Sequence, residues 1–159
     1  MSLITDQTGF QFSLEGVPLR IVSTVPSQTE LLFDLGLGQN IVGVTAYCVH
    51  PQEALERKEV IGGTKDLNLS KILGLQPDLI IGNKEENIKE QIEELRQYVP
   101  VWLSDIKTID DGLGMIKRLG GITESTSVAS NLIEQIEFER LKLLRLRKKL
   151  RVAYFIWKN

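Results

Sequence analysis

The sequence is poor in residues that cross-link a chain or clamp a metal. Cys48 is the single cysteine and His50 the single histidine among 159 residues. One chain can therefore form neither an internal disulfide nor a four-ligand Cys/His zinc site. The net charge of −2 provides no general attraction to nucleic acid or to an anionic membrane. We expect no nucleic-acid partner and no tightly bound cofactor.

Long apolar runs are missing as well. Residues 1–7 lack the basic start and the apolar stretch of a secretory signal. Nowhere do ~18 apolar residues follow one another, as a membrane-spanning helix requires. We therefore expect a chain that is not inserted in a membrane and has no export signal, which leaves a cytoplasmic location open. The 42% of hydrophobic residues suffice for one core without disulfides or a structural metal.

Short β-branched segments alternate with amphipathic segments along the first two thirds of the chain. The pattern predicts strands at 20–24, 41–45, 60–62, 78–82 and 101–103, and helices at 27–35, 51–57, 69–75, 85–98 and 109–119. The last of these helices is expected to stop at Gly120-Gly121. The strands are apolar throughout, which is typical of a parallel sheet between two layers of helices. We predict an α/β fold, a mostly parallel sheet flanked by helices, with a small antiparallel hairpin or edge strand at 10–18.

An uninterrupted amphipathic stretch, 123–149, follows. As a helix of about 27 residues it would be about 40 Å long, so we expect it to project or to span two bodies. Residues 151–157 predict a strand rich in aromatic residues that has no partner within the chain. Either a longer protein or an assembly such as a homo-oligomer would cover this strand. The expected organisation is an α/β lobe at 1–121, a long helix at 122–150 and a terminal strand at 151–159.

Ligands of open parallel sheets bind beyond the carboxyl ends of the strands. Binding residues are therefore expected in the segments 24–28, 46–51, 62–66, 82–86 and 104–105. The sequence has no nucleophile elbow, no P-loop and no zinc-protease motif. Ser27 and Glu30 have the spacing of a capping box, so this helix start either satisfies its own amides or offers them to an anionic or polar ligand.

Tyr47, Cys48 and His50 lie within four residues and include the only thiol and imidazole of the chain. The spacing permits two interpretations. Cys48 and His50 could bind a metal if other parts of the protein supplied further ligands. Alternatively, Tyr47 lines a crevice, Cys48 is a small buried apolar group, and His50 forms a local hydrogen bond.

Several ordered motifs carry a family resemblance. They are RIVSTVPSQTELL at 20–32, VGVT at 42–45, YCVHP at 47–51, IGG at 61–63, LNL at 67–69 and LQPDLII at 75–81. The combination resembles the cobalamin and iron-siderophore substrate-binding proteins of ABC importers. The resemblance implies two α/β lobes joined by one long rigid helix, with the ligand held between the lobes. Segment 123–149 matches that helix, and segment 151–157 matches the first strand of the second lobe.

The resemblance also assigns residues. Pro26, Ser27 and Tyr47 match positions that line the ligand cleft. Thr64 occupies the place of a cleft tryptophan in the cobalamin binder, which makes a large corrin less well accommodated. Ser70 stands where the family has a glutamate that docks to the permease, and Asp66 is the nearest substitute. Together with the strand ends, the expected ligand contacts are Pro26, Ser27, Gln28, Tyr47, Cys48, His50, Thr64, Asn83 and Lys84.

The resemblance implies a binding protein and not an enzyme. Its partners would be a metal chelate, such as cobalamin, heme or a ferric siderophore, and an ABC permease, and its location would be periplasmic or otherwise extracytoplasmic. Because one lobe supplies only half of the expected ligand contacts, this chain is expected to bind the ligand weakly or not at all. One alternative is a cytoplasmic enzyme or chaperone that handles a metal or tetrapyrrole through Cys48 and His50. Another is an interaction module that dimerises through the terminal strand.

Overall fold

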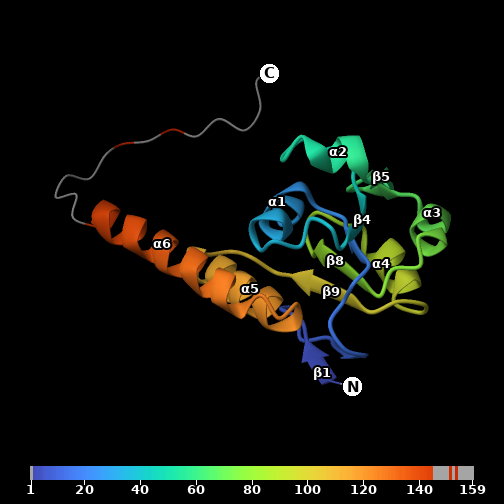
Figure 1. Cartoon of the computed structure of the whole chain (residues 1–159), viewed down its shortest axis with the longest axis horizontal. Coiled ribbons are helices and arrows are strands. Elements are labelled where there is room, and N and C mark those ends of the chain that lie inside the picture. Colours follow the sequence, from blue (N-terminus) through green and yellow to red (C-terminus); the bar gives the residue numbers. More distant parts are fainter. Residues whose placement is uncertain (1, 145–150, 152, 154–159) are drawn as a thin grey trace.

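A computed structural model describes residues 2–144, 151 and 153. Its centre is a five-stranded sheet with the order β5-β4-β3-β8-β9, in which every neighbouring pair is parallel. The strands are β3 (Ile21–Ser23), β4 (Ile41–Val44), β5 (Glu59–Val60), β8 (Leu79–Asn83) and β9 (Val101–Ser104). The parallel sheet with its flanking helices (Figure 1) confirms the predicted fold class.

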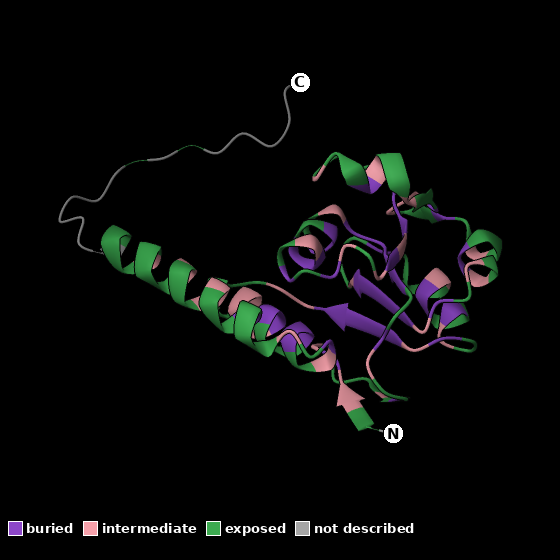
Figure 2. Cartoon of the chain, viewed as in Figure 1, coloured by how far each residue is buried: buried purple, intermediate pink, exposed green. Residues whose placement is uncertain are grey.

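Helices cover both faces of the sheet, because each strand alternates its side chains between two cores. Ile21 and Ile81 belong to the core under α1 (Pro26–Asp34) and α5 (Ile109–Ile122). Their neighbours Val22 and Ile80 belong to the core under α3 (Leu69–Gly74) and α4 (Lys89–Leu95). A short helix, α2 (Glu53–Arg57), adds Ala54 to the first core. The buried sheet lies between these layers in Figure 2.

Two short hairpins lie outside the main sheet. Strand β1 (Ser2–Thr5) pairs with β2 (Gln11–Leu14), so the expected hairpin forms with the preceding residues and does not turn at 15–18. Strand β6 (Gly62–Gly63) pairs antiparallel with β7 (Asp66–Leu67). The sheet strand predicted at 60–62 forms one residue earlier, as β5, and ends at Val60, while Gly62 belongs to this second hairpin. Gly62 has a φ of 103°, a conformation that turns the chain out of the sheet after Val60.

Several helix ends differ from the sequence prediction, and three of the differences have a clear physical reason. The N-cap of α1 is Val25, without a side-chain cap, so the capping box of Ser27 and Glu30 does not form. Helix α4 begins only at Lys89, because the side chain of Asn83 holds residues 85 and 86 in a turn. Helix α5 continues through Gly120-Gly121, since a capped first turn and a buried apolar face support it over 14 residues.

The long helix α6 (Thr126–Leu144) is continuous over its described length. It begins three residues later than predicted, because Glu124 adopts a φ of 54° and separates it from α5. Its first half packs along α5, and its second half extends away from the lobe (Figure 1). The predicted extension to 149 and the strand at 151–157 lie outside the described residues, apart from residues 151 and 153. The three-part organisation of the chain therefore stays a prediction.

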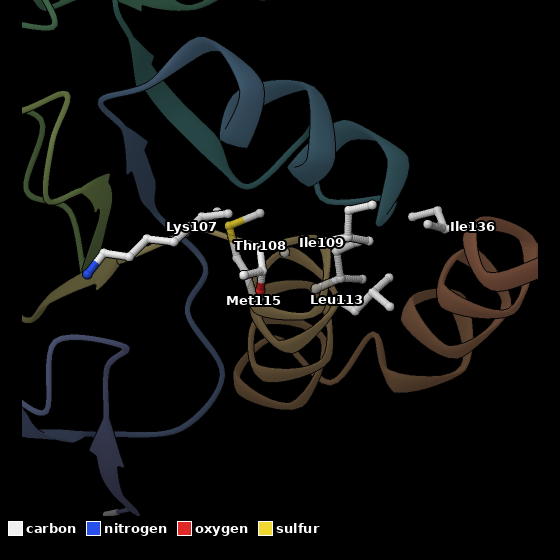
Figure 3. Close-up of a pocket in the computed structure, with 9 residues that line it drawn as sticks. Lys107, Thr108, Ile109, Leu113, Met115 and Ile136 are labelled. Carbon is white, nitrogen blue, oxygen red and sulfur yellow. The ribbon is translucent and has the colours of Figure 1, made fainter. Parts of the chain in front are cut away.

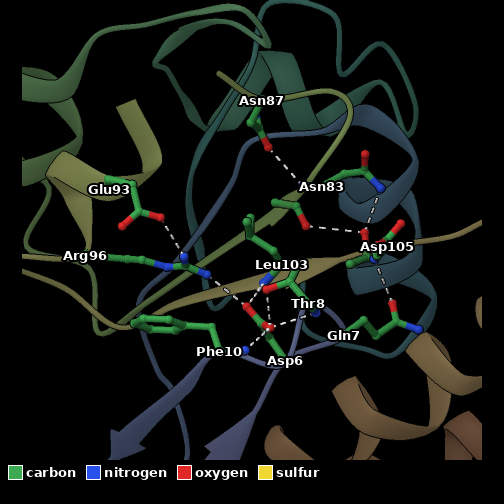
Figure 4. A network of polar contacts seen from close by, with 12 residues as sticks. Asp6, Gln7, Thr8, Phe10, Asn83, Asn87, Glu93, Arg96, Leu103 and Asp105 are labelled. Atoms are coloured by element: carbon green, nitrogen blue, oxygen red, sulfur yellow. Dashed lines mark hydrogen bonds and ion pairs between the residues drawn. The ribbon is translucent and has the colours of Figure 1, made fainter. Parts of the chain in front are cut away.

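The N-terminal hairpin is fastened to the edge strand β9 through the buried carboxylate of Asp6. One oxygen, Oδ1, accepts hydrogen bonds from the amides of Thr8 and Phe10 at 2.8 and 3.0 Å. The other, Oδ2, accepts from the amide of Leu103 and from Arg96 at 3.2 and 2.9 Å. Figure 4 shows these contacts. Because the charge of Asp6 is paired and hydrogen-bonded, its burial is tolerated and the sheet edge is covered.

Candidate functional site

The carboxyl ends of the parallel strands meet at one edge of the lobe, where loops connect them to the helices. The connections after β3, β4, β8 and β9 and the β6-β7 hairpin contribute to this surface, which we call the carboxyl edge. It comprises residues 24–28, 45–51, 62–67, 83–87 and 104–105. Seven of the nine predicted contacts are half-buried or exposed in these segments: Pro26, Ser27, Tyr47, His50, Thr64, Asn83 and Lys84.

Helix α1 starts at this edge. Pro26 is its first residue, where a missing N–H costs nothing because first-turn amides lack helical acceptors. Ser27 is exposed beside it, whereas Gln28 is buried. The Nε2 of Gln28 donates to the carbonyl of Gly82 at 2.9 Å and to Ser104 Oγ at 2.6 Å. Gln28 therefore braces the ends of β8 and β9 from inside and does not face outward.

Tyr47 presents an aromatic surface at the edge. The residue is 63% exposed, and its ring lies against the β6-β7 hairpin. A Cβ placed on Gly63 would be 3.1 Å from Tyr47 Cε2, so glycine allows this close contact. Thr64 follows in the same hairpin and is half-buried. The two residues therefore lie on adjoining segments that can wall one side of a ligand.

Asn83 is the last residue of strand β8, and Lys84 follows it in the turn. The Oδ1 of Asn83 accepts from the amides of Glu85 and Glu86, and its Nδ2 donates to Ser104 Oγ at 2.9 Å. The Nζ of Lys84 lies 2.7 Å from Asp105 Oδ2. This hydrogen bond raises the pKa of Lys84 and lowers the pKa of Asp105. Asp105 was not among the predicted contacts, although its position directly after β9 was a signal for it.

The structure does not bring Cys48 and His50 to a common site. Cys48 is fully buried, and its Sγ lies 3.1 Å from Thr29 Oγ1 and 3.2 Å from Thr45 Oγ1. His50 is exposed and lines a separate depression of about 420 Å³ with Glu30, Phe33, Asp34, Pro51 and Glu53. Among the described residues, no group of three or more His, Cys, Asp or Glu side chains could hold a metal ion.

Asp66 and Ser70, the residues considered for permease docking, are both exposed. Asp66 lies in β7 and Ser70 in the first turn of α3. They are four residues apart in the chain but belong to different elements. Their role in docking stays a prediction.

Sequence reasoning missed an apolar cavity of about 510 Å³ next to the end of β9. Its lining includes Ile106, Leu113 and Met115, and Lys107 stands at one side (Figure 3). Ile109 and Ile136 also line a neighbouring groove of about 370 Å³ on α6. The sequence shows the apolar faces of the two amphipathic helices separately. A groove between them can be predicted only once the geometry of the helix crossing is known.

The described residues thus form an open parallel sheet with a polar carboxyl edge, and a long helix leaves this lobe. The chain belongs to the periplasmic binding protein family, whose model matches residues 21–149. This confirms the resemblance of the sequence motifs. Within the part of the chain that the structure describes, no helix combines the length and the apolarity needed to cross a membrane.

Individual relatives agree with this family. The vitamin B12-binding protein of Pectobacterium atrosepticum is 33% identical over 104 residues, which are 65% of this chain and 37% of that protein. The crystal structure of the periplasmic vitamin B12 binding protein of Vibrio cholerae matches with a TM-score of 0.72 and 32% identity, over 80% of this chain and 50% of that one. A periplasmic heme binding protein from Pseudomonas aeruginosa matches with a TM-score of 0.74 and 26% identity, over 80% and 46%. The chain thus spans half or less of each of these relatives.

Proposed function

We propose that this chain is the N-terminal lobe of an ABC-importer substrate-binding protein that captures a metal chelate outside the cytoplasmic membrane. The names of its relatives support a chelate as cargo, because they bind vitamin B12 or heme. The observation that carries the proposal is that Ser27 and Tyr47 are exposed and Pro26 is half-buried at the carboxyl edge, within the stretch that matches the family.

The proposed mechanism is recognition without chemistry, so the protein is not an enzyme. Tyr47 offers an aromatic face to the apolar body of a chelate. The first turn of α1 offers backbone amides and partial positive charge to its anionic or polar groups. Lys84 adds a cation near the same edge. The chelate brings its own metal ligands, so neither Cys48 nor His50 has to coordinate the metal.

The same proposal includes a second lobe that would hold the ligand from the other side. Helix α6 is the strut that joins this lobe to a second lobe, and 151–159 contributes the first strand of that lobe. Relatives about twice as long support this division, because the matched region leaves room in them for a second body. Permease docking is assigned to the region of Asp66 and Ser70, where Asp66 supplies the negative charge.

The competing function, a metal- or tetrapyrrole-handling enzyme or chaperone, is not favoured. It requires Cys48 to reach a ligand, and the thiol is fully buried between two threonine hydroxyls. A second alternative, an interaction module that dimerises through the terminal strand, depends on residues outside the described part of the chain.

A titration of the 159-residue chain tests the proposal. Cyanocobalamin, hemin and an iron(III) tris-catecholate complex are added while amide shifts are followed by NMR. We expect one of them to shift amides at 26–28, 47 and 63–64, with a Kd weaker than about 1 μM because one lobe supplies half of the contacts. Tyr47→Ala should weaken this binding, whereas Tyr98→Ala, which removes an exposed tyrosine remote from the edge, should not.

Two results would contradict the proposal. If none of the three compounds moves the carboxyl-edge amides at about 1 mM, the edge is not a chelate site. If a compound binds with a Kd well below 1 μM, the chain is a complete receptor and not one lobe of a clamp.

A further inference from the structure

Asn87 lies in the turn between β8 and α4 and is 6% exposed. Its Oδ1 accepts hydrogen bonds from Thr24 Oγ1 and from the amide of Asn83, both at 2.9 Å. Its Nδ2 donates to the carbonyls of Thr64 at 3.0 Å and of Thr24 at 3.4 Å. The orientation of the carboxamide is fixed, because the amide of Asn83 can only donate and must meet an oxygen.

The partners of Asn87 belong to three segments that are distant in the sequence. Thr24 precedes the turn at Pro26, Thr64 lies in the β6-β7 hairpin, and Asn83 precedes Lys84 at the end of β8. These are the segments that carry most of the proposed ligand contacts. One buried carboxamide therefore connects the separate parts of the carboxyl edge.

The surroundings of Asn87 are shaped for this contact. A Cβ on Gly82 would lie 2.6 Å from Asn87 Oδ1 and 2.7 Å from Thr24 Oγ1, so only glycine leaves room for the two groups to meet above β8. A second tie joins the same hairpin and turn, because Lys65 Nζ donates to the carbonyl of Glu85. Figure 4 shows Asn87 above the start of this turn at Asn83.

We propose that Asn87 is the positioning residue of the carboxyl edge. Its side chain holds the Thr64 hairpin, the start of α1 and the end of β8 at fixed distances from one another, without touching the ligand itself. A ligand that contacts all three segments then binds a preformed surface and does not have to order it. This inference rests on the proposed function for its consequence in binding, but the positioning itself can be measured without a ligand.

Amide hydrogen exchange of the 159-residue chain tests the positioning. Asn87→Asp keeps the acceptor but removes both donors and places a carboxylate against two carbonyl oxygens. We expect exchange at 62–68 to accelerate about tenfold or more, while exchange in α5 stays unchanged. Thr24→Val, which removes one hydroxyl donor, should accelerate exchange at the same edge, and Thr24→Ser, which keeps it, should restore protection. Asp6→Asn is the matched control, because it alters a buried carboxyl network at the N-terminal hairpin.

A second experiment measures binding. It uses whichever of cyanocobalamin, hemin or the iron(III) tris-catecholate shifts the carboxyl-edge amide signals of the wild type. Asn87→Asp should weaken its affinity about tenfold, and it should also lower the melting temperature because it buries a carboxylate against two carbonyl oxygens. Asp6→Asn should lower the melting temperature and leave the affinity unchanged. Unchanged exchange at 62–68 in Asn87→Asp, or acceleration spread equally over all strands, would overturn the positioning role. If the wild type binds no probe, the proposed function fails, and the exchange result still decides the role of Asn87.

Discussion

At the scale of single residues, one ion pair at the carboxyl edge joins an exposed lysine to a half-buried aspartate. Lys84 Nζ lies 2.7 Å from Asp105 Oδ2, and Lys107 Nζ lies 3.8 Å from the other oxygen of the same carboxylate. Asp105 therefore neutralises part of the cationic surface that an anionic chelate would meet. Because Lys84 is exposed and water screens the pair, we expect the pair to affect the charge that a ligand meets more than the stability of the fold.

The pH dependence of this pair follows from the direction of its two pKa shifts. The hydrogen bond with Lys84 lowers the pKa of Asp105, so the stabilisation is present above the ordinary carboxyl pKa and is lost as pH falls through the lowered value. Because the pKa of Lys84 is raised, the stabilisation that its charge contributes is lost only as pH rises through that raised pKa. The pair is therefore intact across the neutral range.

An NMR titration of the carboxyl carbons checks this prediction. Asp105 should titrate below the ordinary aspartate value, and Lys84→Met should move its pKa upward because the main hydrogen-bond donor is gone. Asp111 provides the control within the same protein. Its pKa is lowered mainly by the hydroxyl of Thr108 and by nearby amides, so the Lys84 substitution should leave it in place. If the pKa of Asp105 is the same in Lys84→Met as in the wild type, the two side chains are not paired in solution.

At the scale of elements, the crossing of α5 and α6 depends on one glycine. A Cβ on Gly120 would lie 2.4 Å from the Cβ of Ala129, which is too close for any pair of carbon atoms. The buried glycine therefore permits close packing of the two helices and, through them, fixes where α6 leaves the lobe. The neighbouring Gly121 is exposed, and its Cβ would have no atom within 4 Å.

The two glycines give a matched pair of variants. Gly120→Ala should destabilise the lobe by about 1–3 kcal/mol, because the helices must move apart. Gly121→Ala should stabilise it by about 0.5–1 kcal/mol, because alanine loses less backbone entropy in a helix. Urea unfolding followed by circular dichroism measures both. Equal effects of the two substitutions would show that the packing between α5 and α6 is not as close as described.

Elements also show where local sequence signals stop being sufficient. The apolar runs placed β3, β4, β8 and β9 correctly, because burial on both faces leaves a direct trace in composition. Glycine signals were less reliable. Gly120-Gly121 was expected to end α5, but a partner helix needs a small residue there, so the helix continues. The same local pattern thus permits a helix end or a helix crossing, and only the packing decides.

At the scale of the whole molecule, α6 belongs to the lobe in its first half and leaves it in its second. Ala129 is buried against α5, whereas Phe138, Leu141 and Leu143 are 57–67% exposed. These apolar side chains would find a partner surface if a second lobe followed, as the length of the relatives suggests.

Hydrogen exchange across α6 tests this division. Amides at 129–136 should be protected to nearly the global stability, because their opening requires the α5 contact to break. Amides at 138–144 should exchange much faster, because apart from the surface ion pair of Arg140 with Asp110 little contact with the lobe opposes local unwinding. Uniform protection along α6 in the isolated chain, at a concentration low enough to exclude self-association, would show that the second half is covered and would contradict the strut.

The sequence by itself determined the order of the sheet strands, the parallel sheet and the family, and it predicts the edge at which a ligand binds. These features follow from local backbone preference and from burial, and both are recorded in the spacing of apolar residues. Only the tertiary structure decided which polar side chains face outward there. Gln28 turns inward to Gly82 and Ser104, Cys48 is enclosed by Thr29 and Thr45, and Asn87 joins three loops. The direction of such a side chain is set by partners that are distant in the chain, and no local pattern contains them.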